Sequence, residues 1–287
     1  MVPQVRAPAA ACPTVGGTDD ATWSEEESMS WDPTGKVAVI TGASSGIGEA
    51  TARRLGRLGM TVIAAARREE RLQVLANEVP GVVPHVADVT STADVDALAA
   101  RVAEEFGACH ALINNAGVGG GAFDGRDDLD DALRTIDVNL GGTVRCMAAF
   151  AELLAASAPS RVVNVASVAG KLGVGPAAYA ASKFGMVGFS EATSFAWASR
   201  GITVCQLNPG FIETEGFPQT QVKRTPAARV VGEPDDVARA IHRTLLDGAT
   251  ERTVPAWYRA FVVARHVAAP LYRVGASRID RASGSRD

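Results

Sequence analysis

From residue 36 onward, the sequence alternates between short β-branched runs and longer alanine-rich stretches whose apolar residues recur at helical spacing. The β-branched runs are KVAVIT, TVIAAA, GVVPHV, HALIN, RVVNVAS and GITVCQLN. Helices are expected between and after them at residues 49–58, 69–77, 93–106, 129–156 and 176–199. Apolar strands that alternate with helices are typical of a parallel sheet covered by helices on both faces. The alternation therefore predicts an α/β fold.

Residues 36–256 contain no evident boundary or internal repeat, so we expect them to form one domain. Residues 1–35 are rich in small residues and proline and then turn acidic without sustained periodicity, which predicts a flexible leader. A further helix is expected to open at Pro234 and to end at Gly248.

The tail, residues 257–287, carries six arginines against two aspartates. We predict that it is partly helical. An amphipathic helix lying on a membrane is one interpretation of its arginines and aromatic residues. Packing on the domain or on a neighbouring subunit is favoured, because Pro270 interrupts the segment and its apolar face is short.

The charge, the cysteine spacing and the apolar runs of the sequence exclude several classes of function. A net charge of −4 without a basic cluster argues against nucleic-acid binding. The four cysteines, Cys12, Cys109, Cys146 and Cys205, lie far apart without histidines at metal spacing, so we expect free thiols in a reducing compartment and no metal site. Neither a secretory signal nor an apolar run of membrane-spanning length is evident, which predicts a soluble cytoplasmic protein.

The stretch TGASSGIG, residues 41–48, follows the first predicted strand and opens the first predicted helix. Gly42, Gly46 and Gly48 would let the backbone turn tightly against a pyrophosphate, while the helix N-terminus offers N–H groups. A glycine-rich turn without a ligand is the alternative interpretation. The turn lacks the Gly-Lys-Ser/Thr of nucleoside triphosphate hydrolases, so that class is excluded.

Tyr179 and Lys183 lie four positions apart in AAYAASKFG, so a helix would place both on one face. The plain interpretation is an aromatic residue and a lysine on a helix surface. The chemical interpretation starts from the tyrosine pKa of about 10, which is too high for easy proton exchange near neutrality. A neighbouring ammonium would stabilise the phenolate, so we predict that Lys183 lowers the pKa of Tyr179.

Three stretches together resemble a known family. TGASSGIG, NNAG at residues 114–117 and YAASK at residues 179–183 occur in the order and at the intervals of the classical short-chain dehydrogenases/reductases, over about residues 36–256. This resemblance implies a single-domain, Rossmann-type doubly wound fold of about seven parallel strands, a nicotinamide cofactor and carbonyl–alcohol chemistry. The epimerases and dehydratases of the extended branch expect TGxxGxxG instead, whereas Gly46 and Gly48 have the classical spacing.

The resemblance also implies which residues contact the cofactor. They are Gly42, Ser44, Ser45, Gly46, Ile47, Gly48, Arg67, Arg68, Asp88, Val89, Asn115, Ala116, Gly117, Tyr179, Lys183, Pro209, Gly210, Ile212 and Thr214. Ala66 lies where NAD-preferring members carry aspartate, and Arg67 and Arg68 would pair with a 2′-phosphate, which predicts NADP(H) over NAD(H). Two solvated arginines at a helix start are the alternative. Asp88 matches an adenine-contacting aspartate, with a helix N-cap as its alternative, and the proline–glycine pair could be a plain turn.

Asn139, Ser167, Tyr179 and Lys183 match the catalytic set of the family. The resemblance implies that Ser167 binds the substrate oxygen, Tyr179 donates a proton, Lys183 also binds the nicotinamide ribose, and Asn139 holds a water that links Lys183 to solvent. Ser167 could instead bond the backbone at a strand end, and Asn139 a neighbouring carbonyl within its helix. Ser167 and Tyr179 are twelve positions apart where the family usually has thirteen, so the loop GKLGVGP is one residue short.

The combined prediction is an NADP(H)-dependent ketone or aldehyde reductase that forms a homodimer or homotetramer. A catalytically silent regulator or scaffold on the same fold is the alternative, and the complete catalytic set argues against it. Residues 211–231 are expected to form a lid over the substrate, with GVGGGAFDG as a flexible pocket edge. The mixture of Phe211, Phe217 and Pro218 with Lys223 and Arg224 permits a medium-sized, partly apolar alcohol or ketone.

Overall fold

The structure is a computed structural model, which describes residues 31–120, 123–217, 231–270 and 272. Its centre is one sheet with the strand order β3-β2-β1-β4-β5-β6-β7, in which all pairs are parallel. The strands are β1 (Val37–Thr41), β2 (Thr61–Ala66), β3 (Val82–Val86), β4 (Ala111–Asn114), β5 (Ser160–Val165), β6 (Ile202–Pro209) and β7 (Glu251–Val254). The order changes direction between β1 and β4, so the predicted doubly wound fold is confirmed.

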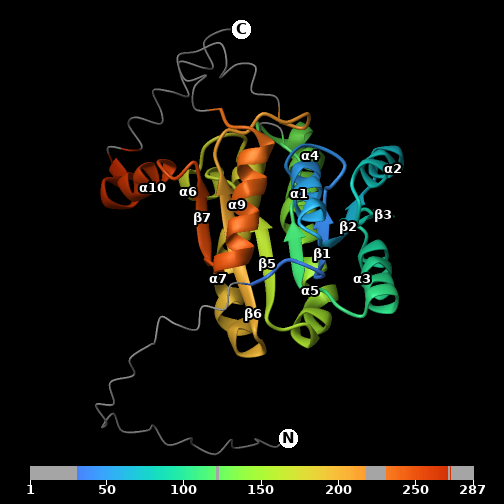
Figure 1. The fold of residues 1–287 in the computed structure, drawn as a ribbon. Helices are drawn as coiled ribbons and strands as arrows, with labels where there is room; N and C mark the ends of the chain where they lie inside the picture. Colours follow the sequence, from blue (N-terminus) through green and yellow to red (C-terminus); the bar gives the residue numbers. More distant parts are fainter. Residues whose placement is uncertain (1–30, 121–122, 218–230, 271, 273–287) are drawn as a thin grey trace, which may run out of the picture.

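Helices cover both faces of the sheet (Figure 1). They are α1 (Gly46–Arg57), α2 (Glu69–Glu78), α3 (Thr92–Phe106), α4 (Leu129–Ile136), α5 (Gly142–Ala156), α6 (Ala169–Leu172), α7 (Ala177–Trp197), α9 (Pro234–Asp247) and α10 (Tyr258–Val267). Alternate residues of β1 point to opposite faces: Ile40 packs in the cluster that includes α1, α2 and α9, and Val39 in the cluster that includes α3 and α5. Both faces are therefore buried, which explains why the central strands β1, β2 and β4 to β6 are largely apolar.

The helix predicted over residues 129–156 consists of three consecutive segments. A π-helical stretch, Asp137–Gly141, joins α4 to α5 and contains Asn139, which is fully buried. The wider π turn changes which residues face the sheet side of the helix, and such turns often occur at functional sites. The expected helix is present, but its hydrogen bonding is not uniform.

The domain begins earlier than predicted. Trp31 is 4% exposed, packs in the α1 side of the core and donates from Nε1 to the Pro159 carbonyl at 3.1 Å. The predicted boundary between leader and domain, at residue 35, is therefore too late in the chain, because the folded domain already includes Trp31. Residues 1–30, which include Cys12, lie outside the described residues.

At the other end, α10 packs against α6, in agreement with a tail that packs on the domain (Figure 1). Tyr258 is buried against Val168 and Leu172, and the Arg265 guanidinium donates to the Lys171 carbonyl. Within the described residues, no helix has the length and apolar character that crossing a membrane requires. Residues 273–287 lie outside the described part of the tail.

The three described cysteines, Cys109, Cys146 and Cys205, are buried free thiols. Burial raises the pKa of each thiol to about 12. A thiol that keeps its proton is a poor nucleophile, so these cysteines serve packing.

Candidate active site

The glycine turn is a tight junction between β1 and α1. Gly42 and Gly46 have φ values of 66° and 56°, a left-handed backbone that other residues rarely adopt. A Cβ on Gly48 would lie 2.3 Å from the Gly42 carbonyl oxygen, so α1 approaches the turn as closely as a glycine allows. The free N–H groups at the start of α1 consequently face the turn, in a cradle that suits a phosphate.

The turn is held in place by the segment after β4. The Asn115 side chain donates from Nδ2 to the carbonyls of Thr41 and Gly42, at 3.0 and 3.3 Å. The Thr41 hydroxyl accepts from the backbone N–H groups of Asn115 and Ala116, at 3.0 and 3.1 Å. The Asn115 amide therefore positions the turn, and Thr41, which the sequence analysis did not single out, is its anchor.

Arg68 lies beside the turn. Its Nε donates to the Ser44 hydroxyl at 3.1 Å, its Nη2 to the Ser45 hydroxyl at 2.6 Å and its Nη1 to the Glu215 carboxylate at 3.0 Å. Arg67 is more exposed and lies 3.8 Å from the Asp88 carboxylate. Two guanidinium groups thus border the cavity at the end of β2, where the sequence predicts a 2′-phosphate site.

Asp88 does not cap a helix. Its carboxylate accepts from the backbone N–H and the hydroxyl of Thr90, at 2.9 and 2.8 Å. Ser91 caps α3, because its hydroxyl accepts from the Asp94 N–H at 3.2 Å. The helix-cap interpretation of Asp88 is therefore wrong, and Asp88 lies in the wall of the cavity.

Tyr179 and Lys183 lie near the N-terminus of α7, where Lys183 is buried and Tyr179 is partly buried. The Lys183 Nζ donates to the Val165 carbonyl at 2.8 Å and lies 5.8 Å from the centre of the Tyr179 ring. Burial lowers the pKa of Lys183 to about 8. Burial also raises the pKa of Tyr179, against the opposing effect of a hydrogen bond with the Ser167 side chain. The pKa of Tyr179 is thus raised and not lowered as predicted, because removal from water outweighs the hydrogen bond with Ser167.

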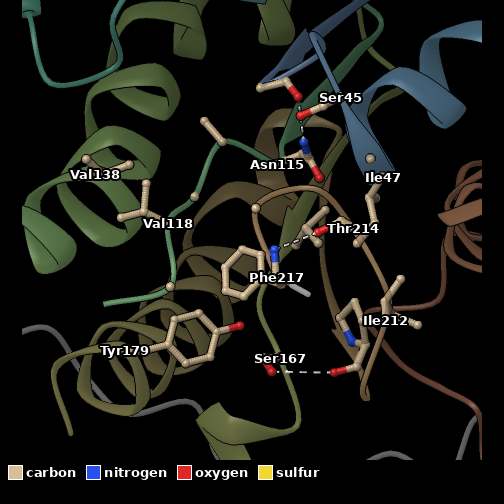
Figure 2. A pocket seen from close by; sticks show the side chains of 18 of the residues that line it. Ser45, Ile47, Asn115, Val118, Val138, Ser167, Tyr179, Ile212, Thr214 and Phe217 are labelled. Carbon is tan, nitrogen blue, oxygen red and sulfur yellow. Dashed lines mark hydrogen bonds between the residues drawn. The ribbon is translucent and has the colours of Figure 1, made fainter. Parts of the chain in front are cut away.

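Ser167 lies two residues beyond β5, with its hydroxyl close to Tyr179 (Figure 2). The hydroxyl also donates to the Pro209 carbonyl at 3.4 Å and accepts from the Ala169 N–H at 3.1 Å. The bond to Pro209 is long, so it can yield to a better acceptor. Ser167 can therefore bond the backbone in the free protein and still turn its hydroxyl toward a substrate oxygen.

The shortened loop still brings Ser167 and Tyr179 together. The short helix α6 and two glycines with positive φ, Gly173 at 67° and Gly175 at 86°, turn the chain back toward α7. Val174, Gly175 and Pro176 line the cavity beside Tyr179. Although the loop is one residue shorter than is usual in the family, it still forms part of the site.

Asn139 lies behind the cavity rather than in its wall. Its Oδ1 accepts from the Val118 N–H at 2.8 Å, and its Nδ2 donates to the Val118 carbonyl and to the Ser182 hydroxyl, both at 3.0 Å. A Cβ on Gly117 would lie 3.2 Å from this Oδ1 and 3.7 Å from the Lys183 Nζ, so the glycine lets the two side chains approach. Asn139 thus links the π turn, the segment after β4 and α7.

These residues surround a cavity of about 770 Å³ at the carboxyl edge of the sheet. Every residue predicted to contact the cofactor lines this cavity, with the exception of Gly48, which lies beneath the turn. The Phe217 ring packs 5.5 Å from the Tyr179 ring, centre to centre (Figure 2). Apolar residues therefore form the wall on the side of the tyrosine.

Only part of the predicted lid can be placed. Phe211 and Phe217 line the cavity, whereas Pro218, Lys223 and Arg224 lie outside the described residues. Sequence reasoning also missed Ser182 and Glu215. Both act through contacts with residues more than forty positions away, for which local sequence contains no signal.

A Rossmann-type sheet with a phosphate cradle at one end of the cavity, and a serine, a tyrosine and a buried lysine at the other, defines a nucleotide-binding oxidoreductase. The family model described as short chain dehydrogenase matches residues 36–224. The chain belongs to the short-chain dehydrogenase/reductase family.

Individual relatives agree with this class. The chain is 34% identical to a 3-oxoacyl-[acyl-carrier-protein] reductase of Synechocystis, over 75% of this chain and 91% of that protein. It is 40% identical to a putative ketoacyl reductase of Streptomyces coelicolor, over 62% of this chain and 71% of that protein. A short-chain dehydrogenase/reductase from Burkholderia phymatum, solved with NAD, superposes with a TM-score of 0.74 at 30% identity, covering 84% of this chain and 96% of that one. An actinorhodin polyketide ketoreductase variant, solved with NADPH, has a TM-score of 0.69 at 31% identity, covering 77% of this chain and 95% of that one.

Proposed function

We propose that this oxidoreductase uses NADP(H) to reduce a ketone or aldehyde. The observation that carries the proposal is the meeting of Ser167, Tyr179 and a buried Lys183 at one end of a cavity whose other end holds the glycine turn and two arginines. Ala66 at the end of β2 supports NADP(H), because the aspartate that would repel a 2′-phosphate is missing there.

The cavity suits an extended dinucleotide. The start of α1 would hold the pyrophosphate, Arg67 and Arg68 the 2′-phosphate, and Lys183 the ribose next to the nicotinamide. The turn between Pro209 and Thr214 would hold the nicotinamide itself. The cofactor, when bound, supplies a hydride to the carbonyl carbon.

The side chains of this protein would then handle the oxygen and its proton. Ser167 donates a hydrogen bond to the carbonyl oxygen, and Tyr179 donates its proton to that oxygen as negative charge develops on it. Tyr179 carries its proton at neutral pH, and because burial raises its pKa, it needs the neighbouring Lys183 ammonium to stabilise the phenolate that forms when the proton is donated. Lys183, with a pKa of about 8, remains largely protonated near neutrality and stabilises the resulting phenolate.

Two names among the relatives suggest a substrate class. The Synechocystis and Streptomyces proteins are described as acting on 3-oxoacyl or ketoacyl groups. The apolar wall formed by Phe217, Val118 and Val174 suits the hydrocarbon part of such a substrate. A 3-oxoacyl thioester is therefore our first choice within the wider class of ketones.

The test is a spectrophotometric screen for NADPH oxidation with 3-oxoacyl thioesters, cyclic ketones, steroids and aldehydes. We expect turnover with at least one of them, and a loss of kcat of about a hundredfold or more in Tyr179→Phe, because general acid catalysis contributes that much. The variant should still bind NADPH, as monitored by the fluorescence of the cofactor. Turnover by Tyr179→Phe at the wild-type rate would contradict the assignment, and cofactor binding without any turnover would favour the scaffold alternative.

We also propose that the protein is cytoplasmic and forms a homodimer or homotetramer through its long helices. The exposed Phe195 of α7 supports a contact there, since it is 76% exposed and apolar. Light scattering coupled to size exclusion measures the mass. A monomer at micromolar concentration would contradict the proposed assembly.

A further inference from the structure

Glu215 reaches across the cavity mouth from the loop after β6 to Arg68, which directly precedes α2, and to Arg71 of α2. Its Oε1 lies 3.0 Å from the Nη1 of Arg68, and its Oε2 lies 3.6 Å from the Nη2 of Arg71. Glu215 directly follows Thr214, which lies against Gly46 in the glycine turn. An acidic side chain thus occupies the position at which a phosphate would approach Arg68.

The three nitrogens of Arg68 are all engaged. Ser44 and Ser45 accept from Nε and Nη2, so Nη1 is the nitrogen that a carboxylate occupies. A guanidinium binds phosphate best with two parallel N–H groups, and the fork of Arg68 is rigid. A 2′-phosphate that takes both terminal nitrogens must therefore displace the carboxylate of Glu215 or lie next to it.

The other charged groups near Arg68 do not remove the competition between the Glu215 carboxylate and a 2′-phosphate. Arg71 shares the Glu215 carboxylate with Arg68, and Arg67 lies near Asp88. A phosphate with a charge near −2 that binds beside the Glu215 carboxylate is repelled by it. The side chains of Arg68 and Glu215 are 44% and 52% exposed, so water weakens their ion pair enough for a phosphate to compete.

We propose that Glu215 is a specificity-determining residue that limits the preference of this enzyme for NADP(H) over NAD(H). Its carboxylate holds Arg68 against Ser44 and Ser45, and it competes with the 2′-phosphate for Nη1. The inference rests on the proposed use of NADP(H), because it assumes that Arg68 binds the 2′-phosphate.

NADPH and NADH differ only in the 2′-phosphate, so their dissociation constants isolate this contact. We would titrate each cofactor into the full-length protein at constant ionic strength and follow cofactor fluorescence, which requires no turnover. Glu215→Gln keeps the shape of the side chain and removes its charge. We expect NADPH to bind about fivefold more tightly to this variant, because exposed ion pairs contribute up to about that factor, and NADH binding to be unchanged.

Glu70→Gln is the matched control. Glu70 is exposed at the start of α2 and pairs with neither Arg68 nor Arg71, so this variant measures the general effect of removing one negative charge. We expect it to change the ratio of the two dissociation constants less than twofold. An equal change in both variants would overturn the inference, because it would make the effect a matter of net charge.

Arg68→Ala separates the two proposals. If this variant loses the preference for NADPH while Glu215→Gln leaves it unchanged or reduces it, Arg68 binds the phosphate and the inference about Glu215 is wrong. If the wild type has no preference for NADPH and Arg68→Ala changes neither constant, the proposed use of NADP(H) fails, and the inference fails with it. Weaker binding of NADH to Glu215→Gln would also overturn the inference, since Glu215 would then bind the unmodified ribose.

Discussion

At the scale of single residues, burial is the dominant influence on the chemistry of this site. It raises the pKa of Tyr179 and lowers that of Lys183, so each group is moved toward its neutral form. The sequence shows that the two residues share a helix face, but it does not show how far water is excluded from them. The proton donor Tyr179 and the cation Lys183 are therefore held close together, and burying the charged lysine lowers the stability of the fold.

Lys183→Met should make the protein more stable at pH 7. The folded-state pKa of about 8 lies below the ordinary value of 10.5, so the folded state binds fewer protons than the unfolded state between these values. The penalty of burying the ammonium is complete below about pH 8 and disappears as the pH rises to 10.5. We expect a gain of about 2 kcal/mol at pH 7, after the loss of the Val165 hydrogen bond, from the 1.36 kcal/mol that each pKa unit represents.

Urea unfolding at pH 7 and pH 9.5 would measure this gain, which should be smaller at the higher pH. The variant should also lose reductase activity. Lys171→Met is the control, because it removes an ammonium that pairs with Glu251 at 3.2 Å and should yield no gain. Lower stability of Lys183→Met than of the wild type at pH 7 would show that the hydrogen bond to Val165 outweighs the burial of charge.

At the scale of elements, close contacts between backbone segments shape the cavity. The β1–α1 turn, the segment after β4 and the π turn before α5 touch one another through side chains of Thr41, Asn115 and Asn139. Local propensity predicts a uniform helix over residues 129–156, and the tertiary contacts of Asn139 with Val118 accompany the π turn there. Element boundaries near the site therefore depend on partners that are distant in sequence.

Gly48→Ala should impair both folding and cofactor binding. The new methyl group would lie 2.3 Å from the Gly42 carbonyl oxygen, and that backbone atom cannot move without opening the turn. We expect a loss of about 2–3 kcal/mol in unfolding free energy, as for other overpacked sites, and NADPH binding weakened at least tenfold. Thermal unfolding and cofactor fluorescence measure the two effects.

Gly188→Ala in α7 is the matched control for this substitution. A Cβ at Gly188 would meet no atom within 4 Å, so alanine should raise stability by up to about 1 kcal/mol through its higher helix propensity. Equal effects of the two substitutions would contradict the steric account of Gly48.

At the scale of the whole molecule, segments before β1 and after β7 complete the domain. Trp31 closes the core on the side of α1 and α9, and Tyr258 covers Gly210 next to the predicted nicotinamide site. A Cβ on Gly210 would lie 2.2 Å from the Tyr258 ring. Helix α10 therefore supports a turn of the cavity, although the alternation of strands and helices does not reveal this.

Trp31→Ala should destabilise the full-length protein by about 3–5 kcal/mol, the usual cost of removing a large buried aromatic side chain. The hydrogen bond to the Pro159 carbonyl would be lost as well. Trp257→Ala is the comparison, because Trp257 is 42% exposed and should cost about 1 kcal/mol or less. Chemical denaturation of the two variants measures the difference. A cost for Trp31→Ala as small as that for Trp257→Ala would place the start of the domain after residue 31.

The sequence by itself determined the order of β1 to β6 and of the helices between them, because burial of both sheet faces leaves an apolar signal in these strands. It did not reveal β7, Glu251–Val254, a short edge strand without an apolar run. The resemblance to the short-chain dehydrogenases/reductases also predicted that the glycine turn, Ser167, Tyr179 and Lys183 lie at one site, and the carboxyl edge of the parallel sheet is where they meet. Only the tertiary structure decided the pKa directions of Tyr179 and Lys183, the backbone role of Asn139 and the contact of Glu215 with Arg68. These depend on burial and on pairs of residues far apart in the chain, and no local pattern encodes either.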